Sequence, residues 1–197
     1  MKNNKLEKLD KYHVDTGCGF ERLVMTLQNK KSSYDTDVFS PIFSMIESIT
    51  KIKYSEHSKI DVSYRIIADH LRTVIFALCD DIIPDEHGRG YIITKVIKRA
   101  MLYLYLYLNG QRGWLFNIGK LMIEYFDVDK KNIMMYIIQN EENKYGNIIW
   151  KSVVEFRKLL NVKNISKETY DHLTKTRGIY KDVVDQFLID NDIKLIE

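Results

Sequence analysis

Apolar residues recur every three or four positions along most of this chain, a spacing that predicts amphipathic α-helices. The clearest stretch runs from residue 58 to residue 80, and its apolar positions are Ile60, Tyr64, Ile67, Leu71, Val74, Ile75 and Leu78. We predict further helices over residues 20–31, from a cap at Asp35 or Thr36 to about Lys51, and over 91–108, 114–126, 129–160, 167–175 and 179–190. The predicted fold class is therefore mainly α.

Residues 14–19 depart from this helical pattern and are typical of a short β-strand. Because successive side chains of a strand face opposite sides, Asp15, Gly17 and Gly19 share one face. That face offers a carboxylate and two gaps where a flat ligand could lie against the backbone. Arg22 follows in the first turn of the next helix, where it is placed to hold an anionic group.

A lone strand cannot satisfy its own backbone donors and acceptors, so this segment implies a sheet supplied from elsewhere. No convincing strand follows Gly19 in the sequence. The alternative interpretation of the segment is structural: the glycines serve packing at a strand–helix junction, and Arg22 pairs with Glu21 on the surface. The residues alone leave both interpretations open.

The second candidate site is a group of cations in and just before the helix predicted over 91–108: Arg89, Lys95, Lys98 and Arg99. The last three share one helix face, opposite the apolar stripe. A charge cluster of this kind is most often only a solvated surface. Arg65 and Arg72 could extend the cluster, but Asp61 and Asp69 lie at ion-pair spacing on the same face.

Composition narrows the function classes only moderately. The 197 residues, 45% of them hydrophobic and 29% charged, suffice for one large domain or two small ones, and a net charge of +3 does not by itself indicate a nucleic-acid partner. Cys18 and Cys79 lie far apart and favour a reduced, cytoplasmic protein. The five histidines show no metal-ligand spacing, so we predict no zinc site. No apolar run approaches the ~20 residues of a membrane span, and no signal peptide is evident.

Several runs carry a family resemblance: HVDTGCGFERLV at 13–24, LQNK at 27–30, YDTDVF at 34–39, YRIIADHLRT at 64–73 and GRGYI at 88–92. They resemble the third signature motif of the class II alanyl-tRNA synthetases and the sequence that follows it, in a form close to the eukaryotic cytosolic enzymes. The likeness is strong from about His13 to Met101 and continues more weakly to the C-terminus.

The resemblance implies a ligase that activates alanine with ATP and Mg²⁺ and transfers it to tRNA(Ala). It implies that Asp15 binds the ammonium group of alanine and that Gly17 helps to set the size of the amino-acid pocket. Gly19 would leave room for ATP, and Arg22 would contact its terminal phosphates. No catalytic side chain is implied, since this chemistry relies on positioning and charge stabilisation more than on protein nucleophiles.

The same resemblance implies two domains. Residues 1–55 would be the C-terminal edge of an antiparallel catalytic domain, and residues 56–197 a helical domain that binds the tRNA acceptor stem. Residues 1–12 are expected to be a tail or junction. The other two class II motifs and the histidine–cysteine signature of an editing domain have no counterpart in this sequence, so we expect the chain by itself to be inactive. Its partners would include the remainder of the catalytic domain.

Two positions depart from the family pattern. An asparagine before Gly-Arg-Gly and an aspartate further on read the acceptor pair in the family, but this chain has Glu86 and Lys175 there. Lys175 replaces an acceptor by a donor, so we expect weaker discrimination at the third acceptor pair. The predicted tRNA-binding residues are Arg65, Arg72, Glu86, Arg89, Lys95, Lys98, Arg99 and Lys175.

Two other functions remain open from the sequence. One is a non-catalytic helical RNA-binding module derived from a synthetase, and the other is a scaffold protein in which the motif is vestigial. The presence of Asp15, Gly17, Gly19 and Arg22 together argues against loss of the ligand site.

Overall fold

The computed structural model describes residues 11–55 and 58–196. By its internal contacts the chain divides into two compact units between Phe39 and Ser40. The predicted domain boundary between residues 55 and 56 therefore lies inside the second unit, and as a functional boundary it stays a prediction. Most of the predicted N-terminal tail, and His57, lie outside the described residues.

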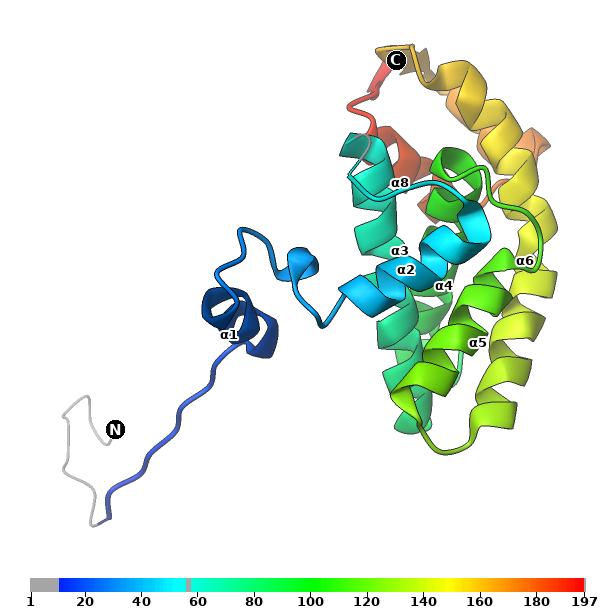
Figure 1. Ribbon diagram of the computed structural model, residues 1–197. Coiled ribbons are helices and arrows are strands. Elements are labelled where there is room, and N and C mark those ends of the chain that lie inside the picture. The colour runs from blue at the N-terminus through cyan, green and yellow to red at the C-terminus, as the bar shows by residue number, and fades with distance from the viewer. Residues whose placement is uncertain (1–10, 56–57, 197) are drawn as a thin grey trace, which may run out of the picture. The chain divides into compact units, whose positions relative to one another are not determined.

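The first unit contains helix α1 (Phe20–Leu27) and the short 3-10 helix η1 (Ser33–Asp35) (Figure 1). Helix α1 ends four residues before the predicted end of its apolar pattern. Its apolar side chains Phe20 and Leu27 are 63% and 77% exposed, and none of its residues is buried. Among the described residues of this unit, η1 contacts α1 but leaves these two side chains of its apolar stripe largely exposed.

Residues 12–19, which include the predicted strand, are exposed and carry no regular secondary structure. The backbone of Gly19 is extended, with φ −68° and ψ 114°. A strand acquires its hydrogen-bonded ladder only from a neighbour, and no strand pairs with this segment among the described residues. The segment is thus extended at its end without being part of a sheet.

The second unit is a bundle of helices that lie alongside one another (Figure 1). Helix α4 packs against α3 and α6, α5 packs against α6, and α2 packs against α3 and α5. The bounds are α2 Ser40–Thr50, α3 Ser58–Cys79, α4 Gly88–Tyr107, α5 Trp114–Phe126, α6 Lys131–Leu159 and α8 Lys181–Asp190. These helices confirm the mainly α fold class. None of the described helices combines the length and apolar character needed to cross a membrane.

The core of the bundle is centred on α4. Every residue from Ala100 to Leu106 on this helix is buried, including Tyr103 and Tyr105. A helix that is apolar or aromatic all round is surrounded by protein on every side. The first three turns of α4 are different, because Lys95 and Ile92 there are exposed. Only this part of α4 can present side chains to a partner.

The chain after α6 forms a small sheet that the sequence did not predict. Strand β1 (Asn164–Ser166) pairs in parallel with β2 (Lys194–Ile196), and Ile165 faces Leu195 in the register. Between them lie α7 (Lys167–Asp171), the π-helical turn His172–Thr176 and α8. The prediction of no strand after Gly19 is wrong, because three-residue strands are too short to display alternation.

Candidate ligand motif and nucleic-acid interface

The ligand motif lies in the first unit, where Gly19 begins α1. The carbonyl oxygen of Gly19 accepts a hydrogen bond from the Leu23 amide at 3.0 Å. A Cβ added to Gly19 would lie 3.5 Å from Cδ of Arg22, so the arginine side chain passes directly over this glycine. A Cβ added to Gly17 would meet nothing within 4 Å. The motif therefore offers an open backbone at Gly17 and a guanidinium close to a helix N-terminus, where an anion is favoured.

The structure does not bring the whole motif together. Asp15 is exposed, and no hydrogen bond or ion pair joins it to Arg22 among the described residues. This is the expected consequence of an unpaired segment, because a strand fixes the direction of its side chains only when it lies in a sheet.

The loop before α4 is held tightly to the start of that helix. The Thr94 hydroxyl donates to the Asp85 carbonyl at 3.0 Å, and Asp85 Oδ1 accepts from the Glu86 amide at 2.6 Å. A Cβ on Gly90 would lie 2.3 Å from the Ile83 carbonyl oxygen, so only glycine fits there. Arg89, between these anchors, is exposed and is held at the first turn of α4.

The three cations predicted to share one exposed face of α4 have three different surroundings. Lys95 is exposed, with its ammonium 5.0 Å from the ring centre of Tyr91. The Arg99 side chain is 33% exposed and its Nη2 lies 3.5 Å from Asp190 Oδ1. Lys98 is only 5% exposed. The prediction of a common solvent-facing surface is therefore wrong for Lys98 and only partly right for Arg99.

Lys98 is buried because helix α8 and the residues before it cover this side of α4. Its ammonium lies 3.5 Å from Asp182 Oδ2, 4.0 Å from the ring centre of Tyr180 and 5.0 Å from that of Tyr145. An ammonium can be buried when a carboxylate and aromatic faces replace its water. Lys98 thus joins α4, α6 and α8.

The remaining predicted contacts are paired within the second unit. Arg65 donates from Nε and Nη2 to the Tyr54 hydroxyl at 2.9 and 2.7 Å, and Arg72 pairs with Asp69 at 3.2 Å, as the spacing on α3 predicted. Glu86 and Lys175, the two predicted positions outside α3 and α4, also form ion pairs. Glu86 Oε1 lies 3.9 Å from Lys144 Nζ, and Lys175 Nζ lies 3.0 Å from Asp171 Oδ2. All of these ion pairs are at least partly exposed, so they are weak and open to competition by phosphate.

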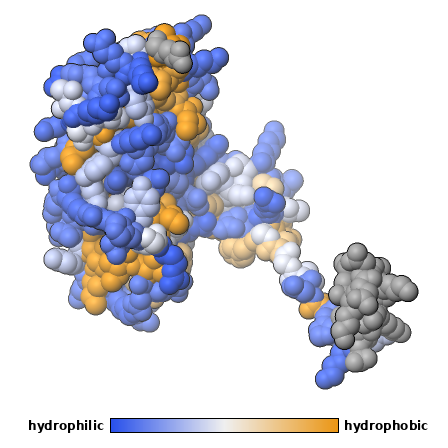
Figure 2. All heavy atoms as spheres, turned by 180° about the vertical axis from the view of Figure 1, so that it is seen from behind, coloured by the Kyte–Doolittle hydropathy of each residue, from blue (hydrophilic) through white to orange (hydrophobic). Residues whose placement is uncertain are grey.

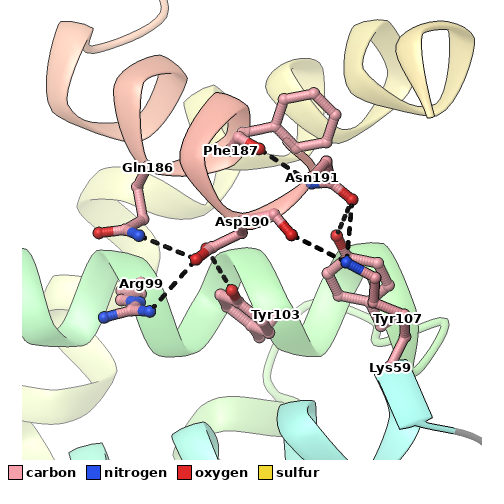
Figure 3. Close-up of polar contacts among 8 residues, drawn as sticks. All are labelled: Lys59, Arg99, Tyr103, Tyr107, Gln186, Phe187, Asp190 and Asn191. Carbon is pink, nitrogen blue, oxygen red and sulfur yellow. Dashed lines mark hydrogen bonds and ion pairs between the residues drawn. The ribbon is translucent and has the colours of Figure 1, made fainter. Parts of the chain in front are cut away.

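Helix α8 is fixed to the bundle at its C-terminal end by a polar network (Figure 3). The Asp190 carboxylate accepts from the Tyr103 hydroxyl and from Gln186 Nε2, at 3.0 Å for the latter, and lies beside Arg99. The carbonyl oxygen of Asp190 accepts from Lys59 Nζ at 2.8 Å. Burial, followed by the hydrogen bond to Asp190, raises the pKa of Tyr103, so its hydroxyl remains a donor.

The profile of a family described as tRNA synthetases class II (A) matches residues 1–196. The chain belongs to this family. An alanine–tRNA ligase of Christiangramia forsetii is 33% identical over 99% of the chain and 23% of the relative's length. That of Candida albicans is 46% identical over 58% of the chain and 12% of its own length. A mitochondrial alanine–tRNA ligase of Saccharomyces cerevisiae is 43% identical, also over 58% of the chain and 12% of its own length.

The chain thus spans less than a quarter of the length of these synthetases. Sequence reasoning missed the two acidic residues of α8 that form ion pairs with Lys98 and Arg99 of α4. Asp182 and Asp190 lie within the predicted helix over 179–190, but nothing in their spacing connects them with residues more than eighty positions earlier. Their partners follow only from how α8 packs on α4.

Proposed function

We propose that this chain is the part of an alanine–tRNA ligase that carries a portion of the alanine and ATP site and the surface for the tRNA acceptor stem. The observation that supports it most is the family match across residues 1–196, together with the alanine–tRNA ligases among its relatives. The exposed Arg22 over Gly19 and the exposed cations at the start of α4 are consistent with this proposal.

In the ligand site, Asp15 binds the ammonium group of alanine and Gly17 borders its pocket. Gly19 admits ATP, and Arg22 holds the terminal phosphates. Among the described residues, no group of three or more histidine, cysteine, aspartate or glutamate side chains is placed to hold a metal ion. Mg²⁺ usually binds together with substrate phosphates, and we propose that it arrives here with those of ATP.

On the tRNA surface, Arg89 and Lys95 contact phosphates of the acceptor stem, and Arg99 contributes less because Asp190 shares its charge. Arg65, Arg72 and Lys175 exchange their present partners for phosphate at some cost. Lys98 acts from within the fold and makes no phosphate contact. Since Glu86 and Lys175 carry charges where relatives have neutral or acceptor groups, we expect weak discrimination at the third acceptor pair.

The tRNA surface is tested by titrating the 197-residue chain with tRNA(Ala) at several salt concentrations. We expect Lys95→Ala and Arg89→Ala each to lower affinity and to reduce the log–log salt slope by about 0.7 to 0.9, the value for one phosphate contact. Lys120→Ala, an exposed lysine on α5 whose side chain is 50% exposed, is the matched control. Unchanged slopes in both variants would refute the surface.

The ligand site is tested in the enzyme that includes the remaining catalytic domain, by alanine-dependent ATP–pyrophosphate exchange. Arg22→Ala raises the KM for ATP, because a charge-assisted phosphate contact contributes about 1.5–3 kcal/mol. Asp15→Ala raises the KM for alanine and leaves that for ATP nearly unchanged. Normal exchange kinetics in both variants would exclude the motif as the site. We expect no exchange by the 197-residue chain alone.

We also propose a cytoplasmic location, supported by two free thiols, Cys18 and Cys79, which a reducing compartment maintains. One similar synthetase is described as mitochondrial. Fractionation of cells followed by immunoblotting distinguishes the two compartments, and recovery of the protein only in mitochondria would refute the cytoplasmic assignment.

A further inference from the structure

Helix α6 is the longest of the described helices and lies along one side of the bundle (Figure 1). Its inner side packs against α4 and α5. Its outer side carries a row of four exposed residues spaced seven apart: Ile133, Asn140, Asn147 and Val154. Residues seven apart stay on one face of a helix, so this central row runs along the outside of α6. We call the central row and the two flanks beside it the α6 face.

The two flanks of the α6 face differ in chemistry. Positions three and four residues after each central residue lie on opposite sides of it, because the helix has about 3.6 residues per turn. The first flank is aromatic and polar, and it consists of Tyr136, Asn143 and Trp150, all of them exposed. The second flank is aliphatic and basic, and it consists of the half-buried Ile137 and the exposed Lys144 and Lys151.

Apolar contact alone does not select a partner for this face. Figure 2 shows that apolar patches are separated by hydrophilic surface on the side of the molecule opposite that of Figure 1. In the central row, Ile133 and Val154 stand at the two ends, and asparagines lie between them. An asparagine amide both donates and accepts hydrogen bonds, so it is complementary to a second asparagine. The central row therefore matches a copy of itself.

The unlike flanks set the orientation of such a pair. A two-fold axis parallel to α6 places each central residue opposite the same residue of the second copy. It also places the first flank of each copy across the second flank of the other. Trp150 then meets Lys151 of the second copy in a cation–π pair, and the Asn143 oxygen meets Lys144 of the second copy. An antiparallel pair would bring the two lysine flanks together, which repulsion between like charges opposes.

We propose that the α6 face binds the α6 face of a second copy of this chain, with the two helices parallel. The central row is about 32 Å long and one helix face wide, so the interface is small and the dimer is reversible. RNA fits this face less well, because the central row is uncharged and Glu86 already lies 3.9 Å from Lys144. The dimer does not depend on the proposed alanine, ATP and tRNA sites.

The dimer is tested by sedimentation of the 197-residue chain over a range of concentrations. We expect monomer at about 1 µM and a growing dimer fraction toward about 1 mM, the range of weak complexes. Tyr136→Ala should weaken the dimer by about tenfold, because it removes an aromatic contact from each copy. Leu27→Gln on α1, the control for another exposed apolar helix, should leave the dimer unchanged. A chain that stays monomeric at about 1 mM would overturn the proposal.

The orientation is tested by Asn143→Glu. In the parallel pair the new carboxylate meets Lys144 of the second copy twice, so we expect the dimer to tighten by about three- to tenfold, as two exposed ion pairs allow. In an antiparallel pair the two new carboxylates would face each other and weaken the dimer. Asn117→Glu, at an exposed position on α5, makes the same change of charge away from the face and should have no effect. A weaker or unchanged Asn143→Glu dimer contradicts the parallel arrangement.

A cross-link locates the contact directly. In a chain that also carries Cys18→Ser and Cys79→Ala, Asn147→Cys should form a disulfide-linked dimer under mild oxidation. The reason is that the parallel pair brings this position to its own copy, and a disulfide requires Cα atoms within about 7 Å. Lys120→Cys on α5 is the control, and equal cross-linking of the two variants would refute the contact. Absence of a dimer, with saturable binding of an oligouridylate that Tyr136→Ala removes, would overturn the proposal in favour of an RNA surface.

Discussion

Glu142 of α6 provides the most direct test of how the bundle is held together. Helix α5 has no side-chain cap of its own, and Gly113 precedes it with φ +85°. The Glu142 side chain, which is 4% exposed and belongs to a different helix, supplies this cap. Its Oε1 accepts from the Gly113 amide at 2.9 Å, and its Oε2 accepts from the Phe116 amide at 2.8 Å. Oε1 also accepts from the Tyr105 hydroxyl of α4 at 2.9 Å.

The size of the effect follows from these contacts. A hydrogen bond to a charged group contributes about 1.5–3 kcal/mol, and buried donors left without an acceptor add a penalty. We therefore expect Glu142→Ala to lower the free energy of unfolding by about 3–5 kcal/mol, the usual cost of breaking a buried charged network. Glu142→Gln keeps the volume but replaces one acceptor by an NH₂ group that faces an amide donor, so we expect about 1–3 kcal/mol.

The assay is urea unfolding of the chain followed by circular dichroism. Glu124→Ala is the control, because Glu124 on α5 is half exposed and 4.0 Å from Lys120. An exposed pair of this kind contributes at most about 1 kcal/mol. A Glu142→Ala variant within 1 kcal/mol of the unmodified chain, with the m-value unchanged, would refute the role of Glu142 as the cap of α5.

Three further perturbations follow from the second unit. Burial, followed by the charge of Arg99, lowers the pKa of His70 from 6.5 to about 4. Between these pH values the unfolded chain binds a proton that the folded chain does not, so the free energy of unfolding falls by up to about 3 kcal/mol as the pH drops to 4. In unfolding measured at pH 7.5 and 4.5, His70→Asn should remove this part of the acid sensitivity. Gly90→Ala places a Cβ 2.3 Å from the Ile83 carbonyl oxygen and should cost about 1–3 kcal/mol, whereas Gly17→Ala should melt at the unmodified temperature. Lys98→Met should lower the melting temperature and leave the salt slope of tRNA binding unchanged. A reduced slope would show instead that Lys98 contacts a phosphate of the tRNA.

The helices could be predicted from the sequence because each needs only a local pattern. Helix α5 (Trp114–Phe126) matches its predicted range, since Gly113 precedes it and its apolar positions recur at helical spacing. The strands β1 and β2 could not be predicted, because their three residues each show no alternation and their pairing joins segments thirty positions apart. Length and sequence separation explain this difference.

The positions of the cations could be predicted, but not their surroundings. Lys95, Lys98 and Arg99 do share one side of α4, as their spacing required. Whether a side chain on that side meets water depends on what packs there, and α8 brings Asp182 to Lys98 and Asp190 to Arg99. A periodic pattern describes the angle of a side chain around its own helix and contains no information about a helix that arrives later in the chain.

The acids of α8 therefore set how much positive charge α4 can offer to a phosphate. Of the three cations on that side, Lys98 is neutralised within the fold and Arg99 is shared with Asp190, so Lys95 carries most of the available charge. The same carboxylates hold α8 in place, since Asp190 also accepts from Tyr103 and Gln186. Affinity for an anionic partner and the docking of α8 are thus linked through one residue, and a stronger phosphate contact at Arg99 would weaken its hold on α8.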